Sequence, residues 1–177
     1  QLVIQLFAAF ATGGAVVASQ YLGHKEQKKA QASAKQLLNL CVIAGVFFIA
    51  ICLPLRRIIL NGIFGALDPQ VMDNALTYFV WILFSFPLLG IYNSCAALCR
   101  AMGNSKISLK VSLVMNLTNI AGNAILIYGA KIGVAGAGIS TLLSRGIAAV
   151  VMLCILSQKK WPLFLEKIWK PQFYFTL

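Results

Sequence analysis

Five polar side chains recur within one largely apolar stretch, at steps of three or four residues. At about 3.6 residues per turn, these steps return to the same face of a helix. Amides that face lipid would leave donors and acceptors unpaired, at a cost of roughly several kcal/mol each. We therefore expect this polar stripe either to line a cavity or to join helices through hydrogen bonds. Its members are Ser108, Ser112, Asn116, Asn119 and Asn123.

A second, weaker polar face lies near the start of the chain. Gln5 and Thr12 share it with Gln1 and Ser19, at steps of four or seven residues. The same reasoning makes Gln5 and Thr12 candidates for lining a cavity.

Arg145 is the one charged residue within the long apolar stretches. An arginine at the centre of a membrane helix costs roughly 2.5–3.5 kcal/mol on insertion scales, so it requires a partner. The apolar stretches contain neither aspartate nor glutamate. We expect the partner to be a backbone carbonyl, an asparagine of the polar stripe or a group outside this chain. A structural role and a functional role both remain open.

The residue types needed for catalysis are absent from the apolar stretches. The chain has one histidine, His24, which lies beside lysines, and its five cysteines form no CxxC pair. We therefore predict a protein that is not an enzyme, with no catalytic residue, no metal site and no cofactor. If the natural protein is driven by an ion, its main titrating group should lie outside these 177 residues.

Five uncharged or nearly uncharged stretches must position these side chains. The chain is 60% hydrophobic and only 11% charged, with a mean hydropathy of +0.84. A bilayer core of roughly 30 Å needs about 20 apolar residues as helix. We predict an all-α, polytopic membrane bundle of five transmembrane helices over residues 1–158. The predicted spans are 1–23, 36–55, 74–99, 111–130 and 132–158.

The net charge of +11 is distributed unevenly among the loops. Lysine and arginine exceed acidic residues in loops 24–35 and 100–110 and in segment 159–177, whereas the intervening loops carry little net charge. This alternation is the positive-inside pattern of membrane proteins and excludes a nucleic-acid-binding domain. It predicts a multi-pass protein of the plasma or inner membrane, with residue 1 outside and the basic segment 159–177 in the cytoplasm.

Local signals refine these spans. Pro87 predicts a kink in the third span, because proline removes a backbone donor and clashes with the carbonyl four residues earlier. Pro54 is expected to end the second span before an interfacial or re-entrant segment. Residues 24–35 read as a separate interfacial helix, with its lysines facing anionic lipid. Gly133, Gly136 and Gly138 predict close helix packing at the start of the fifth span.

Three segments resemble the multidrug and toxic compound extrusion (MATE) family of transporters. They are SQYLGHKEQKKAQASAKQLL (19–38), GNSKISLKVSLVMNLTNIAGNAILIYG (103–129) and GVAGAGISTLLSR (133–145). The resemblance implies that the five spans are helices two to six of a twelve-helix transporter. Since the chain begins at Gln1 inside an apolar run, we expect a partial N-terminal lobe, with segment 159–177 leading to a second lobe.

The resemblance also implies a function and site residues. Such transporters export cationic or amphipathic compounds by antiport with protons or sodium, through alternating access between two lobes. Polar residues of helices five and six act there with an acidic residue of helix one, and Asn119, Asn123 and Thr141 match the polar positions. Asn123 departs from members that have aspartate, and Ser108 stands where proline is frequent, which leaves the coupling ion open. The alternatives are a lipid-linked oligosaccharide flippase and a non-transporting membrane scaffold.

Overall fold

The computed structural model describes residues 2–65, 68–158 and 160–163. Within these ranges the regular elements are helices, and five of them are long and apolar enough to cross a membrane. The prediction of an all-α membrane bundle is thereby confirmed. Most of segment 159–177 lies outside the described residues. The elements are α1 (Leu2–Gly23), α2 (Gln27–Phe64), α3 (Pro69–Ala101), α4 (Ser105–Asn123), a π-helical extension η1 (Ala124–Gly129) and α5 (Val134–Leu156).

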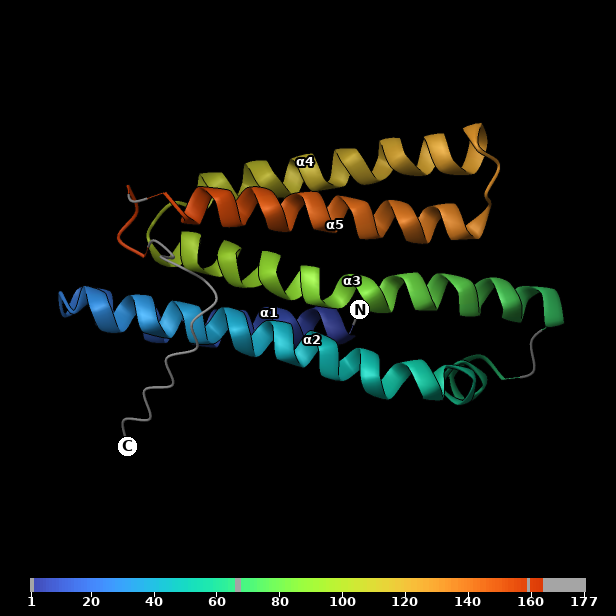
Figure 1. The fold of residues 1–177 in the computed structure, drawn as a ribbon, viewed down its shortest axis with the longest axis horizontal. Coiled ribbons are helices and arrows are strands. Elements are labelled where there is room, and N and C mark those ends of the chain that lie inside the picture. The colour runs from blue at the N-terminus through green and yellow to red at the C-terminus, as the bar shows by residue number, and fades with distance from the viewer. Residues whose placement is uncertain (1, 66–67, 159, 164–177) are drawn as a thin grey trace.

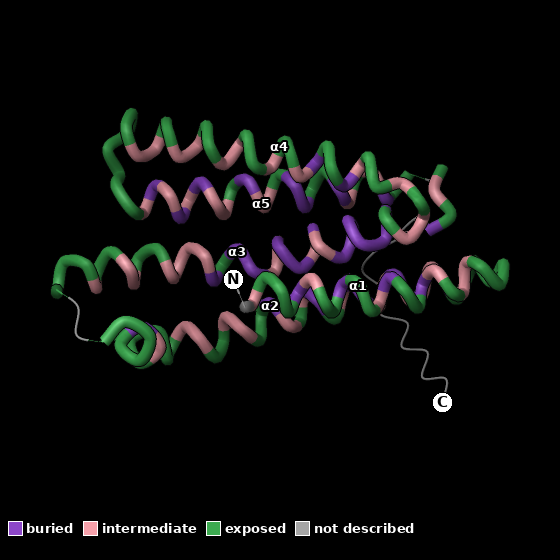
Figure 2. The backbone as a smooth tube through the Cα atoms, turned by 180° about the vertical axis from the view of Figure 1, so that it is seen from behind, coloured by how far each residue is buried: buried purple, intermediate pink, exposed green. Residues whose placement is uncertain are grey.

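Helix α3 is the centre of the bundle (Figure 1). It contacts α1 and α2 on one side and α4 and α5 on the other, whereas α1 touches neither α4 nor α5 within the described residues. Figure 2 shows that the buried residues gather along the second half of α3 and on the neighbouring helices. Most of the side chains of α4 are exposed or only half-buried. Helix α3 therefore links the α1–α2 pair to the α4–α5 pair.

The boundaries of α3 follow from local sequence signals. The Asp68 carboxylate accepts a hydrogen bond from the Gln70 backbone N–H at 3.2 Å, and Pro69 occupies the first turn. Both features are typical of helix starts. At the other end, Gly103 has a φ of 78° and the Asn104 N–H donates to the Cys99 carbonyl at 2.9 Å. This left-handed glycine closes α3 and reverses the chain into α4.

Two local predictions for the second span are wrong. Residues 27–35 do not form a separate helix, because α2 begins at Gln27 and continues into the membrane span without a helix-breaking residue. Pro54 does not end the helix either, since α2 continues to Phe64. The last turns of α2 are seen end-on in Figure 1, so the helix bends sharply there instead of stopping. Proline bends a helix by removing one backbone hydrogen bond, and the flanking turns persist.

Glycines bring α2 and α3 into close contact. A Cβ atom at Gly45 would lie 2.7 Å from the Cα of Pro87, and one at Gly90 would lie 2.9 Å from the Cys41 carbonyl oxygen. Small residues allow this approach of two membrane helices. Next to this crossing, the rings of Phe7, Phe48 and Phe86 join α1, α2 and α3, with centroids 6.0–6.3 Å apart.

The glycine-rich start of α5 is explained in two ways. Gly136 faces Leu126 and Gly138 faces Trp81, where an added Cβ would lie 3.0 and 2.6 Å from the nearest atom, so close packing is confirmed there. Gly133 has no neighbour in reach of a Cβ, and its φ of 65° shows a turn role instead. For Gly133, the packing prediction is wrong.

The charge pattern gives a test of topology. The start of α4 and the start of α2 lie at one end of the bundle, and the α4–α5 loop lies at the other (Figure 1). We expect a membrane-impermeant thiol reagent to label Lys131→Cys from outside in intact cells, in a background without the native cysteines. Lys106→Cys should react only after the membrane is opened, and Lys28→Cys should behave like Lys106→Cys. The opposite labelling would contradict the predicted orientation.

Candidate functional site

A hydrogen-bond network centred on Asn119 joins α4 to α5. The Asn119 Nδ2 donates to Thr141 Oγ1 at 3.2 Å and to Ser144 Oγ at 3.4 Å. The Ser140 hydroxyl donates to the Asn119 backbone carbonyl at 2.9 Å. The fourth turn of α4 is thus fastened to α5 by amide and hydroxyl groups within the span.

Asn123 extends this network by one turn. Its Nδ2 donates to Asn119 Oδ1 at 3.2 Å. Its own Oδ1 is buried and has no hydrogen-bond partner among the described residues. A buried acceptor without a partner is uncommon in proteins and calls for a functional or structural reason. The network therefore ends in a buried acceptor, Asn123 Oδ1, that no described group satisfies.

The backbone next to this unpaired acceptor is also unusual. Helix α4 changes into the π-helical turn η1 directly after Asn123. A side chain at Gly122 would clash with the Ser140 hydroxyl, so glycine there lets α5 approach α4. π-Helical turns are rare and occur frequently at functional sites. The polar network thus lies beside a local irregularity of the helix.

The structure brings together only some of the predicted site residues. Asn119, Asn123 and Thr141 share the network, whereas Asn116 is exposed on α4 and forms no hydrogen bond among the described residues. Gln5 and Thr12 are exposed on α1, and the Thr12 hydroxyl donates to the Ala8 carbonyl of its own helix at 2.8 Å. Because α1 does not touch α4 or α5, the two polar faces do not form one site within the described residues.

Arg145 has a partner that the sequence analysis did not include. Its Nη1 donates to the hydroxyl of Ser85 on α3 at 2.5 Å, and the Ser85 hydroxyl donates in turn to the Ile82 carbonyl at 2.6 Å. Ser85 is fully buried and Arg145 is half-buried. The sequence analysis expects Arg145 to pair with a backbone carbonyl, an asparagine of the polar stripe or a group outside this chain. For Nη1 this expectation is wrong, because the partner is a serine hydroxyl. Within the described residues, the one ion pair joins Lys29 to Glu26, so Arg145 has no carboxylate partner there.

Sequence reasoning missed several polar groups of this region. Ser140 and Ser144 are buried on α5, and Asn93 on α3 has a buried Nδ2 without a partner among the described residues. Their only signal was a polar residue type within an apolar span, which a search for stripes on single helices does not find. Contacts between residues far apart in the chain define the site.

The chemistry of the network is that of neutral oxygen and nitrogen groups. Amide and hydroxyl oxygens can coordinate a cation or accept a hydrogen bond, and the amide nitrogens can donate. No aspartate, glutamate or histidine joins the network in the described part of the chain, and no group of three metal-ligating side chains occurs there. The network can therefore bind or orient a ligand, but it cannot exchange protons by itself.

Five membrane-spanning helices with a polar network inside the span define a multi-pass membrane protein. The MatE family model matches residues 1–125, and the chain belongs to this family. Its relatives include the "Uncharacterized transporter YisQ" of Bacillus subtilis (strain 168), 30% identical over 89% of the chain. A "Probable multidrug resistance protein NorM" of Thermotoga maritima is 25% identical over 89% of the chain.

Solved structures share the fold. The chain superposes with a TM-score of 0.88 on an inward-facing multidrug resistance MATE family transporter, over 96% of the chain and 39% of that protein, at 22% identity. On an outward-facing transporter of the same family, the chain superposes with a TM-score of 0.84, over 93% of the chain and 36% of that protein, at 21% identity. The chain covers 35% of the length of both YisQ and this NorM protein. It therefore corresponds to about one third of such a transporter.

Proposed function

We propose that the natural polypeptide containing this chain is a secondary active transporter that exports cationic or amphipathic compounds. Export would be driven by antiport with protons or sodium, with alternating access between two lobes. The observation that carries this proposal is the Asn119 network with its open Asn123 acceptor, located inside a membrane span. Amides inside a span must either join helices or face a cavity, and the Asn123 acceptor without a described partner favours a cavity.

The proposal assigns roles to the site residues. Asn119, Asn123 and Thr141 would face the ion or substrate, and Asn116, Gln5 and Thr12 would line the cavity once the rest of the transporter is in place. The network lacks a titratable group, so proton coupling would need a carboxylate outside these residues. Residues 1–158 would form most of the N-terminal lobe, and segment 159–177 would lead through the cytoplasm to the second lobe. Similarity to both inward-facing and outward-facing structures supports a lobe that keeps its fold during transport.

A lipid-linked oligosaccharide flippase is the second candidate. Arg145 is the observation that favours it, because its half-buried guanidinium makes one hydrogen bond among the described residues and could attract a phosphate. A non-transporting scaffold would use the Asn119 network only to hold α4 against α5. We prefer the multidrug proposal because three relatives carry the name "Probable multidrug resistance protein".

Ethidium efflux tests the proposal directly. The natural full-length polypeptide is expressed in drug-sensitive cells, and the loss of ethidium fluorescence is followed for the wild type and for Asn123→Ala. We expect the substitution to slow efflux severalfold at unchanged expression, because it removes both the open acceptor and the bond to Asn119. Val114→Ala, on the exposed face of the same helix, is the matched control and should export at the wild-type rate.

The outcomes separate the three candidates. Collapse of the proton gradient or removal of sodium should each be tested, and loss of efflux in one condition identifies the coupling ion. Unchanged efflux by Asn123→Ala would contradict the role of the network. No efflux from well-expressed wild type would contradict the multidrug proposal and favour the flippase. If Asn123→Ala lowers the amount of folded protein together with efflux, the network holds the helices together, as in the scaffold alternative.

A further inference from the structure

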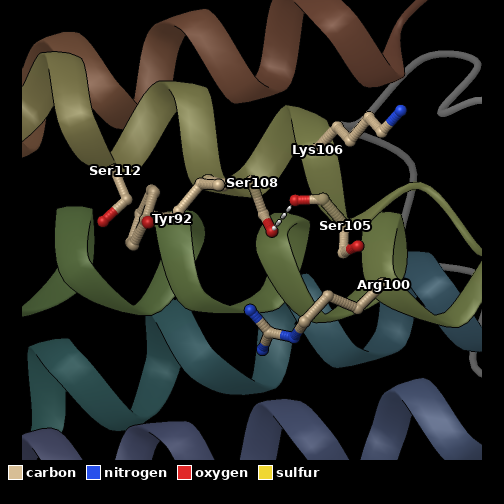
Figure 3. A pocket seen from close by; sticks show the side chains of 7 residues that line it. Tyr92, Arg100, Ser105, Lys106, Ser108 and Ser112 are labelled. Carbon is tan, nitrogen blue, oxygen red and sulfur yellow. Dashed lines mark hydrogen bonds between the residues drawn. The ribbon is translucent and has the colours of Figure 1, made fainter.

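A shallow, open pocket lies between the end of α3 and the start of α4, away from the Asn119 network (Figure 3). Its volume is about 410 Å³, within the range of small-molecule sites. The proposed function assigns no role to this pocket. Its lining residues are Tyr92, Arg100, Ser105, Lys106, Ser108, Leu109 and Ser112.

The charge of the pocket lining is entirely positive. Arg100 and Lys106 contribute cationic groups, and no lining residue is acidic. Neither cation has an ion-pair partner in the described part of the chain, where Lys29 and Glu26 form the single pair. In Figure 3 the Arg100 guanidinium lies on the side of the serines that faces α2, and the Lys106 ammonium extends away from them at the edge. Such a site repels cations and attracts anions, so it is separate from a route for cationic substrates.

Hydroxyl groups complete the lining with unused hydrogen-bonding capacity. Tyr92 is only 8% exposed, yet its phenol has no hydrogen-bond partner among the described residues and lines the pocket. The Ser112 hydroxyl is likewise without a partner in this part of the structure, and Figure 3 shows it next to Tyr92. The Ser108 hydroxyl donates to the Ser105 carbonyl at 3.0 Å and keeps its acceptor capacity. The free hydroxyl groups of Tyr92 and Ser112 can therefore donate hydrogen bonds to a polar ligand in the pocket.

The start of α4 lies at the same pocket. Ser105 and Lys106 lie in the first turn of α4, and the Asn104 side chain forms no capping hydrogen bond. The first amide groups of a helix point outward and carry partial positive charge, which favours phosphate and other anions. The ligand favoured by the guanidinium, the hydroxyls and the helix start is therefore the same: an anion such as a phosphate group.

The surroundings of the pocket indicate where the ligand comes from. Leu109 lines the pocket and is 70% exposed, and Leu113 and Leu117 continue this exposed apolar face one and two turns further along α4. In a multi-pass membrane protein this face can receive acyl chains. A polar headgroup in the pocket with chains along α4 matches a phospholipid better than a free anion.

We propose that this pocket binds the phosphate group of an anionic phospholipid of the membrane leaflet next to the α3–α4 turn. Arg100 pairs with the phosphate, Tyr92 and Ser112 donate hydrogen bonds to it, and Lys106 closes the site from its edge. The acyl chains lie along Leu109, Leu113 and Leu117. A bound headgroup ties the end of α3 to the start of α4, where the chain reverses.

Native mass spectrometry of the natural full-length polypeptide in detergent tests this site. The protein is titrated with palmitoyl-oleoyl phosphatidylglycerol, with the corresponding phosphatidylcholine and, separately, with inorganic phosphate and glycerol 3-phosphate. We expect preferential binding of phosphatidylglycerol. Arg100→Gln should weaken that binding roughly tenfold or more, since a charge-assisted bond to phosphate is lost. Tyr92→Phe, which keeps the ring, should weaken it a few fold.

Lys110→Gln is the matched control. Lys110 is exposed one turn from Lys106 on the same helix and does not line the pocket. We expect it to retain wild-type affinity, whereas an equal loss for Lys110→Gln and Arg100→Gln would overturn the site in favour of diffuse surface charge. Equal binding of phosphatidylcholine would overturn the preference for an anion. Binding of inorganic phosphate as tight as that of phosphatidylglycerol would overturn the lipid as its source. If Arg100→Gln fails to fold, Tyr92→Phe is the deciding variant, and wild-type affinity of Tyr92→Phe for phosphatidylglycerol would overturn the site.

Discussion

Replacement of Gly45 by isoleucine is expected to remove nearly all folded protein from the membrane. A Cβ at this position would lie 2.7 Å from the Cα and 2.8 Å from the nitrogen of Pro87. These are backbone atoms in the middle of α3 and cannot rotate away as a side chain can. Isoleucine adds three further carbons, so α2 must separate from α3. Overpacking of this kind costs about 3 kcal/mol, and more where the backbone is the obstacle.

The loss of folded protein can be measured by fluorescence-detected size-exclusion chromatography of a fusion to a fluorescent protein. We expect the monodisperse peak to fall more than tenfold. Gly13→Ile is the matched control, because Gly13 lies on the exposed face of α1 and no atom is within 4 Å of its Cβ position. A wild-type profile for Gly45→Ile would show that α2 and α3 are further apart than described here.

The number and order of the spans could be predicted because lipid imposes one simple requirement on the sequence. A stretch that stays uncharged for about 20 residues crosses the bilayer as a helix. The ends of the helices could not be predicted in this way. Helix α2 has 38 residues, about 57 Å at 1.5 Å per residue, and thus continues well beyond a bilayer core of roughly 30 Å. Basic residues mark the membrane surface, but they do not terminate a helix.

The candidate site was predictable only where its residues follow one helix. The spacing of Asn119 and Asn123 placed both on one face of α4, and the resemblance supplied Thr141 on α5. Ser140, Ser144 and Ser85 could not be found in this way, because each meets its partner across a helix–helix contact. The π-helical turn after Asn123 was also missed, since an apolar sequence such as AILIYG carries no distinct signal for it.

Arg145→Met is expected to stabilise the protein and to abolish most of its transport. The arginine costs roughly 2.5–3.5 kcal/mol within the membrane. One hydrogen bond to the Ser85 hydroxyl offsets part of this cost, at about 1.5–3 kcal/mol for a bond to a charged group. Methionine has a similar length and no charge to desolvate, so the midpoint of thermal unfolding should rise by a few degrees.

We expect transport to become slower although the protein becomes more stable. The guanidinium has five N–H donors, and one of them contacts Ser85 in the described structure. In the proposed transporter, the remaining donors would be available to hold another part of the protein in place. We expect at least tenfold slower efflux for Arg145→Met, and partial activity for Arg145→Lys, which keeps the charge. Ser85→Ala should slow efflux less than Arg145→Met, because the charge remains and only its anchor is lost. A stabilised Arg145→Met protein with wild-type efflux would show that the arginine is not needed for transport.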